Sequence, residues 1–203
     1  MASPDALLFD FDGVLADTEP VHCACWAEAI RPLGIHLDWE MYREFGIGSS
    51  DRALAEILAR GTALTPDEVL ARHPEKQRLF AARMLADPPI PARVKQYIKS
   101  LIGRRMAVVT SSFRVEIEPV LLKAGIRDCF EALVSGDEVS NLKPHPEPYL
   151  RAAKLLGAKS PLAIEDSDAG VASARAAGFE VLRLAGPDEL PSKLAARLNG
   201  THT

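Results

Sequence analysis

Two aspartates, one residue apart, end the first apolar segment of the chain in LLFDFDGVLADTEP (7–20). Asp10 and Asp12 point to the same side of an extended strand, because side chains alternate along it. Carboxylates this close repel each other unless a cation lies between them, and Mg²⁺ prefers oxygen ligands of this kind. Gly13 permits a tight turn and lets a ligand approach the backbone. A solvated Asp-Gly turn is the alternative, so this motif alone leaves structure and chemistry both open.

A second pair of acids ends a later apolar segment, in IEDSDAG (164–170). Glu165 and Asp166 close the apolar run, whereas Ser167 is expected to cap the helix that follows. Two consecutive carboxylates at the end of a buried strand are costly unless they are neutralised. The pair therefore favours a metal site shared with the first motif.

Hydroxyl groups and a lysine follow two further apolar segments. VVTSS ends in Thr110, Ser111 and Ser112, which either cap a helix or supply donors to a phosphate. NLKPHPEP places Lys143 in a loop stiffened by three prolines, which hold its charge in place. An ammonium held in this way can neutralise phosphate oxygens.

The elements that must position these residues form a parallel sheet. Apolar runs predict strands at 6–11, 105–110, 131–135, 161–166 and 180–184. Helical patterns with short turns separate the last four, which favours right-handed βαβ crossovers. The four motifs follow the first four strands, at the carboxyl ends where open parallel sheets bind ligands. We therefore expect a site for Mg²⁺ and a phosphate at this edge.

The segment between the first two predicted strands has helical periodicity instead. Thr18 is a candidate N-cap with Pro20 in the first turn, and Thr65 with Glu68 forms a capping box. The expected fold is an α/β, Rossmann-like, doubly wound parallel sheet with an inserted α-helical cap domain. The core domain is predicted at 1–15 and 92–203, and the cap domain at 16–91.

Composition excludes several other classes of protein. A net charge of −4 provides no electrostatic footprint for nucleic acid or an anionic membrane. No stretch approaches the ~18 apolar residues of a membrane helix, and the amino terminus does not predict a signal peptide. The three cysteines, Cys23, Cys25 and Cys129, suggest free thiols in a reducing compartment. We expect a cytoplasmic protein, a monomer or weak dimer, with no nucleic-acid or membrane partner.

The ordered motifs DFDGVLADTEP, VVTSS, LKPHPEPY and IEDSDAGV resemble the haloacid dehalogenase superfamily of phosphohydrolases. The helical insert resembles the phosphoglycolate phosphatase and β-phosphoglucomutase branch. The resemblance implies that Asp10 attacks phosphorus to form an aspartyl-phosphate. It implies that Asp12 first protonates the leaving alcohol and then activates water.

The same resemblance implies how the remaining core residues act. Thr110, Lys143 and backbone amides hold the transferring phosphoryl group. Mg²⁺ is held by Asp10, by the backbone carbonyl of Asp12 and by Asp166, with Glu165 nearby, directly or through water.

Residues of the insert are expected to read the leaving group. The candidates are Glu19, His22, Ser49, Ser50, Arg52 and Lys76, and Gly13, Ser111 and Ser112 complete the substrate-binding set. His22 has the alternative of simple packing, and Arg52 and Lys76 have the alternative of solvated helix charges.

Three other activities compete with a phosphatase. Dehalogenases of the superfamily lack the acid at the position of Asp12, so phosphoryl transfer is favoured. Sugar-phosphate mutases of this branch carry an arginine soon after the glycine where this chain has Ser49 and Ser50. A phospho-acceptor signalling module, like a response-regulator receiver, would lack the helical insert. The prediction is a Mg²⁺-dependent phosphatase acting on a small phosphate monoester, of the sugar phosphate or phosphoglycolate type, with the mutase and the signalling module as alternatives.

Overall fold

The computed structural model describes residues 3–47 and 49–200, which form two compact units. The first, here called the core unit, comprises Met1–Asp17 and Pro88–Thr203. The second, the cap unit, comprises Thr18–Asp87. Each unit has its own hydrophobic cluster and is described separately.

The core unit is built on a five-stranded parallel sheet in the order β3-β2-β1-β4-β5. Its strands are β1 (Leu7–Phe9), β2 (Met106–Val109), β3 (Ala132–Val134), β4 (Leu162–Glu165) and β5 (Glu180–Arg183). In β1, Leu8 lies opposite Ala107 of β2 and Ala163 of β4. The strand order reverses beside β1, which places the ends of β1 and β4 at the switch point where doubly wound sheets bind ligands. The predicted α/β fold class is confirmed, and all five predicted strands are present.

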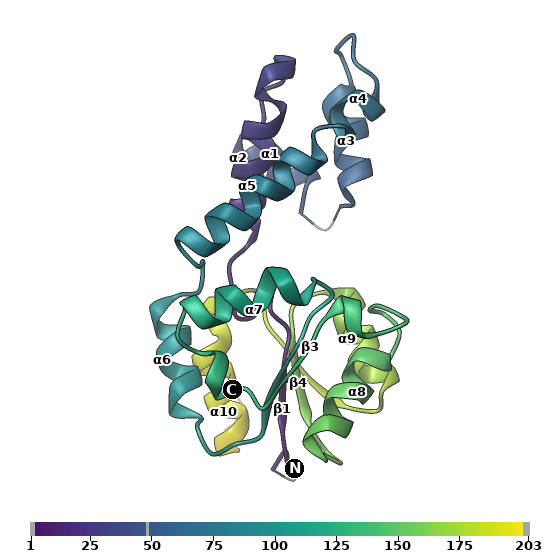
Figure 1. Ribbon diagram of the computed structural model, residues 1–203. Coiled ribbons are helices and arrows are strands. Elements are labelled where there is room, and N and C mark those ends of the chain that lie inside the picture. Colours follow the sequence, from purple (N-terminus) through teal and green to yellow (C-terminus); the bar gives the residue numbers. More distant parts are fainter. Residues whose placement is uncertain (1–2, 48, 201–203) are drawn as a thin grey trace. The chain divides into compact units, whose positions relative to one another are not determined.

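Helices cover both faces of this sheet (Figure 1). On one face lie α8 (Glu147–Leu156) and α9 (Asp168–Ala176); on the other lie α6 (Ala92–Ser100), α7 (Arg114–Lys123) and α10 (Leu190–Asn199). Short 3-10 turns occupy Arg127–Cys129, Gly136–Glu138 and Pro187–Glu189. The four residues of β2 and of β4 are all buried, because a parallel sheet covered on both faces needs continuous apolar strands.

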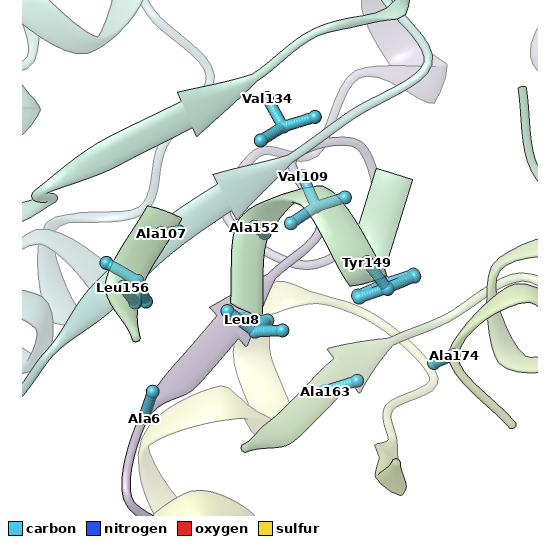
Figure 2. Packing of buried hydrophobic residues seen from close by; sticks show 10 residues of the cluster. All are labelled: Ala6, Leu8, Ala107, Val109, Val134, Tyr149, Ala152, Leu156, Ala163 and Ala174. Atoms are coloured by element: carbon cyan, nitrogen blue, oxygen red, sulfur yellow. The ribbon is translucent and has the colours of Figure 1, made fainter. Parts of the chain in front are cut away.

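The face beneath α8 shows how the sheet packs (Figure 2). Tyr149 and Ala152 of α8 belong to one buried cluster with Leu8 of β1 and Val109 of β2. Tyr149 is fully buried, so its ring packs in the core while its hydroxyl needs a polar partner there. That partner is a residue of the site described below.

The regular elements in the described part of the cap unit are all helices. It contains α1 (Glu19–Ile30), a 3-10 turn (Arg31–Leu33), α2 (Trp39–Phe45), α3 (Asp51–Ala59), α4 (Pro66–Leu70) and α5 (His73–Ala86). The capping box predicted at Thr65 and Glu68 is present, and Ser50 caps α3. Thr18 occupies the N-cap position of α1 without a side-chain capping bond. No helix of the described residues is long and apolar enough to cross a membrane.

The units divide at 17/18 and 87/88, whereas the sequence predicted 15/16 and 91/92. The proline-rich segment 88–91 belongs to the core unit for two reasons. The amide of Asp17 donates to the carbonyl of Pro89 at 2.8 Å, and the side chain of Ile90 is buried. The segment that leads into the cap unit, at Asp17, and the segment that returns from it, at Pro89, therefore lie next to each other within the core unit.

Candidate active site

Lys143 is at the centre of the candidate site, at the carboxyl edge of the sheet. Its ammonium donates to Asp10 Oδ1 at 2.8 Å, to the carbonyl of Val109 at 2.9 Å and to Glu165 Oε1 at 2.6 Å. These three acceptors come from the ends of β1, β2 and β4, which are neighbours in the sheet. A lysine has three N–H donors, so all of them have protein partners.

Three carboxylates gather beside this lysine. Asp10, Glu165 and Asp166 each offer an oxygen, and these oxygens lie within 4.8 Å of one another. Gly13 makes room for the third acid: it has a φ of +69°, and a Cβ there would lie 2.0 Å from Asp166 Oδ2. An all-oxygen set of acids is the donor chemistry that a hard divalent cation such as Mg²⁺ requires, so the residues fit the expected metal.

The burial of these acids explains their electrostatics. Burial raises the pKa of Asp10 well above its ordinary value, although the nearby Lys143 opposes the shift. Burial and the charge of Glu165 raise the pKa of Asp166 to about 6. Burial by itself would lower the pKa of Lys143, but Asp10 and Glu165 outweigh it and raise that pKa. The site therefore carries more carboxylates than its one lysine neutralises, which favours binding of a further cation.

The second aspartate of the first motif is held by the hydroxyl loop that follows β2. Ser112 Oγ donates to Asp12 Oδ2 at 3.2 Å, and Thr110 Oγ1 accepts from the amide of Ser112 at 3.0 Å. Thr110 is buried, while Ser111 is exposed beside it. The structure thus brings the hydroxyl loop to Asp12 and shows Ser112 contacting the acid itself.

Two contacts of the site were missed by the sequence reasoning. Tyr149 donates its hydroxyl to Glu165 Oε1 at 2.6 Å, and Ser173 Oγ donates to the carbonyl of His145 at 2.5 Å, which holds the loop that carries Lys143. Tyr149 stands in the motif LKPHPEPY, six residues after the lysine, so its presence was visible. The direction of the Tyr149 side chain could not be predicted from the sequence, since it depends on how α8 packs on the sheet. Ser167 caps α9 through a bond from the amide of Gly170, as predicted.

The candidates of the cap unit have partners within that unit. Tyr42 donates its hydroxyl to Glu19 Oε2 at 3.0 Å. The imidazole of His22 stacks on the ring of Phe80, with 4.1 Å between centroids. Burial, and then the charge of Lys76, lower the pKa of His22 to about 4, so its ring is neutral at pH 7.

Lys76 is not the solvated helix charge that was its alternative reading. Its side chain is 8% exposed, with Nζ 3.8 Å from Asp51 Oδ1 and near the ring faces of Trp26 and Phe80. Asp51 also accepts from Trp26 Nε1 at 3.0 Å and lies 2.8 Å from Nε2 of His73. A buried ammonium group requires partners of this kind, because an unpaired buried charge is costly. Asp51 was missed from the sequence because only packing shows that it joins three helices.

Arg52 and the two serines are at the surface. Arg52 pairs with Asp67 at 2.5 Å and with Glu56 at 3.4 Å, and its side chain is 54% exposed. Ser50 accepts from the amide of Ala53, and Ser49 is exposed. The solvated reading therefore fits Arg52 and fails for Lys76.

The parallel sheet with acids, a lysine and hydroxyls at its carboxyl edge defines a hydrolase of the haloacid dehalogenase type. The sequence profile of that group, described as a haloacid dehalogenase-like hydrolase, matches residues 4–178. The chain belongs to this family, as its motifs predicted.

Several relatives are named phosphatases. The chain is 34% identical to the fructose-1-phosphate phosphatase YqaB of Escherichia coli, over 87% of this chain and 94% of that protein. It is 31% identical to the phosphoglycolate phosphatase of Nitrosococcus oceani, over 91% and 85% of the two chains. Among solved structures, CbbY of Rhodobacter sphaeroides in complex with phosphate is similar, with 28% identity, a TM-score of 0.66 and coverage of 89% and 85%. The chain is thus similar over most of its length to enzymes of the phosphatase class.

Proposed function

We propose that this protein is a Mg²⁺-dependent phosphatase that hydrolyses small phosphate monoesters through an aspartyl-phosphate on Asp10. One observation carries the proposal: Asp10 accepts a hydrogen bond from Lys143 and has an oxygen within 4.8 Å of an oxygen of Asp166, at the sheet edge where Ser112 holds Asp12. A nucleophile, a proton carrier and a phosphate-neutralising charge are the three parts that phosphoryl transfer requires.

Asp10 and Asp12 divide the chemistry. A carboxylate oxygen of Asp10 forms a bond to phosphorus while the bond from phosphorus to the alcohol oxygen breaks, and Asp12 gives its proton to that oxygen. Water then attacks the phosphorus of the aspartyl-phosphate, Asp12 takes a proton from the water, and the Asp10 carboxylate leaves. The hydrogen bond from Ser112 to Asp12 ties the proton carrier to the loop that carries Thr110.

Lys143 and the metal ligands offset the negative charge. All three ammonium protons of Lys143 have protein acceptors, so a phosphate oxygen binds Lys143 by replacing one of these acceptors. Asp10 is the acceptor that is replaced, because its carboxylate must turn to reach phosphorus. Asp10, Asp166 and the carbonyl of Asp12 would hold Mg²⁺, which supplies Lewis-acid neutralisation of phosphoryl oxygens when bound. Thr110 and the amide of Ser111 are the proposed phosphate donors.

Sugar phosphates are the proposed substrates, with phosphoglycolate as the second class to test. The relative with 34% identity is named a fructose-1-phosphate phosphatase, and the match spans nearly all of it. A mutase must bind a second phosphate, whereas this chain has Ser49 and Ser50 at the expected place and ties Arg52 to Asp67 and Glu56. We therefore propose phosphate hydrolysis and not the mutase reaction. The three free cysteines are consistent with a reducing compartment, and we propose the cytoplasm.

Phosphate release from fructose 1-phosphate, glucose 6-phosphate, phosphoglycolate and p-nitrophenyl phosphate tests the proposal. The wild type with Mg²⁺ should hydrolyse at least the sugar phosphates and the aryl ester. Asp10→Asn should be inactive on all of them, while Asp128→Asn, an exposed aspartate on the same unit, should match the wild type. Full activity in Asp10→Asn would show that the nucleophile is wrongly assigned.

Asp12→Asn separates the two chemical steps. p-Nitrophenolate leaves without a proton, so this variant should still release about one nitrophenolate per active site and then stall with phosphate on Asp10. Rapid quenching in acid followed by mass spectrometry of the peptide containing Asp10 detects the intermediate. Steady turnover by Asp12→Asn at the wild-type rate would contradict the assigned role of Asp12.

A further inference from the structure

The carboxylate of Glu165 is saturated by donors from the protein. Oε1 accepts from Lys143 Nζ and from the Tyr149 hydroxyl, both at 2.6 Å. Oε2 accepts from the amides of Asp166 and Ser167 at 3.1 and 3.4 Å, and from Ser167 Oγ at 3.2 Å. Two carboxylate oxygens offer about four lone-pair positions, and five donors already point at them. A metal would reach Glu165 only by displacing one of these donors.

The surrounding structure leaves Glu165 no other place to go. Its side chain is fully buried, and the backbone of α9 comes so close that a Cβ on Gly170 would lie 1.8 Å from Oε1. Asp166, in contrast, is partly exposed and faces Gly13. The two consecutive acids therefore have different surroundings, although the sequence placed both at the expected metal site.

Among the described residues, Tyr149 is the one neutral donor to Oε1, and it is fixed by the core. Its ring is fully buried in the cluster under α8, with Lys143 Nζ 5.2 Å from the ring centroid. The hydroxyl and the ammonium therefore approach the same oxygen from two fixed elements, α8 and the loop before it. This contact joins the hydrophobic core to the charged centre of the site.

We propose that Tyr149 is a positioning residue: through Glu165 it holds the ammonium of Lys143 beside the Asp10 carboxylate, and Glu165 serves Lys143 and not the metal. The inference rests on the proposed phosphatase function. Without the hydroxyl, Oε1 loses one of its two donors and draws Lys143 toward itself. Lys143 then lies farther from Asp10, where its charge is needed while the phosphoryl group transfers.

Tyr149→Phe tests this with the loss of a single oxygen, since the ring that packs in the core is kept. We expect kcat for p-nitrophenyl phosphate to fall about tenfold, with KM changed less than about twofold. The Mg²⁺ affinity of the free protein, measured by isothermal titration calorimetry, should stay within about twofold of the wild type. Tyr97→Phe removes the same atom from a half-buried tyrosine of α6 and should leave all three quantities unchanged.

A readout without turnover is the ¹⁵N signal of the Lys143 ammonium, identified by its absence from Lys143→Arg. It should shift in Tyr149→Phe and stay in place in Tyr97→Phe. Glu165→Gln is the second variant: it should lose kcat while keeping its Mg²⁺ affinity, and it serves alone if Tyr149→Phe does not fold.

Each outcome has one meaning. An active wild type with kcat unchanged in Tyr149→Phe, or with Mg²⁺ affinity reduced tenfold in Glu165→Gln, overturns the inference while the proposed function stands. A wild type that hydrolyses no phosphate ester refutes the proposed function itself. In that case the ammonium signal and the calorimetry still decide whether Tyr149 positions Lys143.

Discussion

Acid should destabilise the cap unit through one histidine. His22 stacks on Phe80 and faces the charges of Lys76 and Asp51. Burial first, and then Lys76, lower its pKa from 6.5 to about 4. The unfolded chain therefore binds a proton at a higher pH than the folded unit does. The stability due to the neutral ring is complete above pH 6.5 and is lost as the pH falls from 6.5 to 4.

The magnitude follows from these two pKa values. Between pH 8 and pH 5 the unfolded imidazole becomes almost fully protonated, whereas the folded one stays mostly neutral. The difference amounts to about 2 kcal/mol of unfolding free energy. His22→Phe keeps a flat ring against Phe80 and removes the titration. The wild type should therefore lose about 2 kcal/mol more than His22→Phe over this pH range.

Urea denaturation followed by tryptophan fluorescence measures this effect. Both tryptophans of the chain, Trp26 and Trp39, lie in the cap unit, so the signal reports that unit. Other titrating groups are shared by both proteins and cancel in the comparison. His36→Gln is the matched control, because the His36 side chain is 86% exposed, and it should show the wild-type pH dependence. A difference below about 0.5 kcal/mol between wild type and His22→Phe would refute the reasoning.

Three further substitutions have outcomes that the structure predicts. Gly13→Ala places a Cβ 2.0 Å from Asp166 Oδ2, at a φ of +69° that is strained for alanine. The Mg²⁺ concentration for half-maximal hydrolysis should therefore rise at least about tenfold, and an unchanged Mg²⁺ titration would contradict this. Thr65→Ala removes the acceptor for the amide of Glu68 and should cost about 1 kcal/mol of cap stability by the same fluorescence assay. Arg114→Met removes a half-buried guanidinium that donates to two glutamates and a carbonyl, and thermal unfolding should show the core unit destabilised by about 1–3 kcal/mol. Equal melting curves for this variant and the wild type would show that these contacts are exchanged for water without loss.

Local patterns account for the parts of the fold that the sequence predicted well. The apolar runs 6–11 and 161–166 contain β1 and β4, because a short, continuous apolar segment between turns is typical of a strand in a parallel sheet that is covered on both faces. The capping box at Thr65 formed because its bonds join residues three apart. The limits of the cap were less predictable, since the segment 88–91 is placed by a hydrogen bond to Asp17, far away in the chain.

The candidate site shows the same division. Asp10, Asp166 and Lys143 could be predicted to lie near one another because parallel strands bring their carboxyl ends to one edge, and the motifs stand at those ends. The partners of Lys143 were not predictable from spacing, because they are set by the register of three strands. The burial of Lys76, for which the sequence left a substrate contact and a solvated charge as alternatives, depends on how α1, α3 and α5 pack together.

The sequence by itself determined the class of fold, the order of the motifs and the residue types that are candidates for chemistry. These depend on periodicity, on turn residues and on a strand geometry that every parallel sheet shares. Only the tertiary structure decided that Tyr149 reaches Glu165, that Glu165 is saturated while Asp166 is partly exposed, and that Asp51 joins three cap helices. The physical reason is that such contacts join side chains far apart in the chain, and packing alone sets their distance and direction.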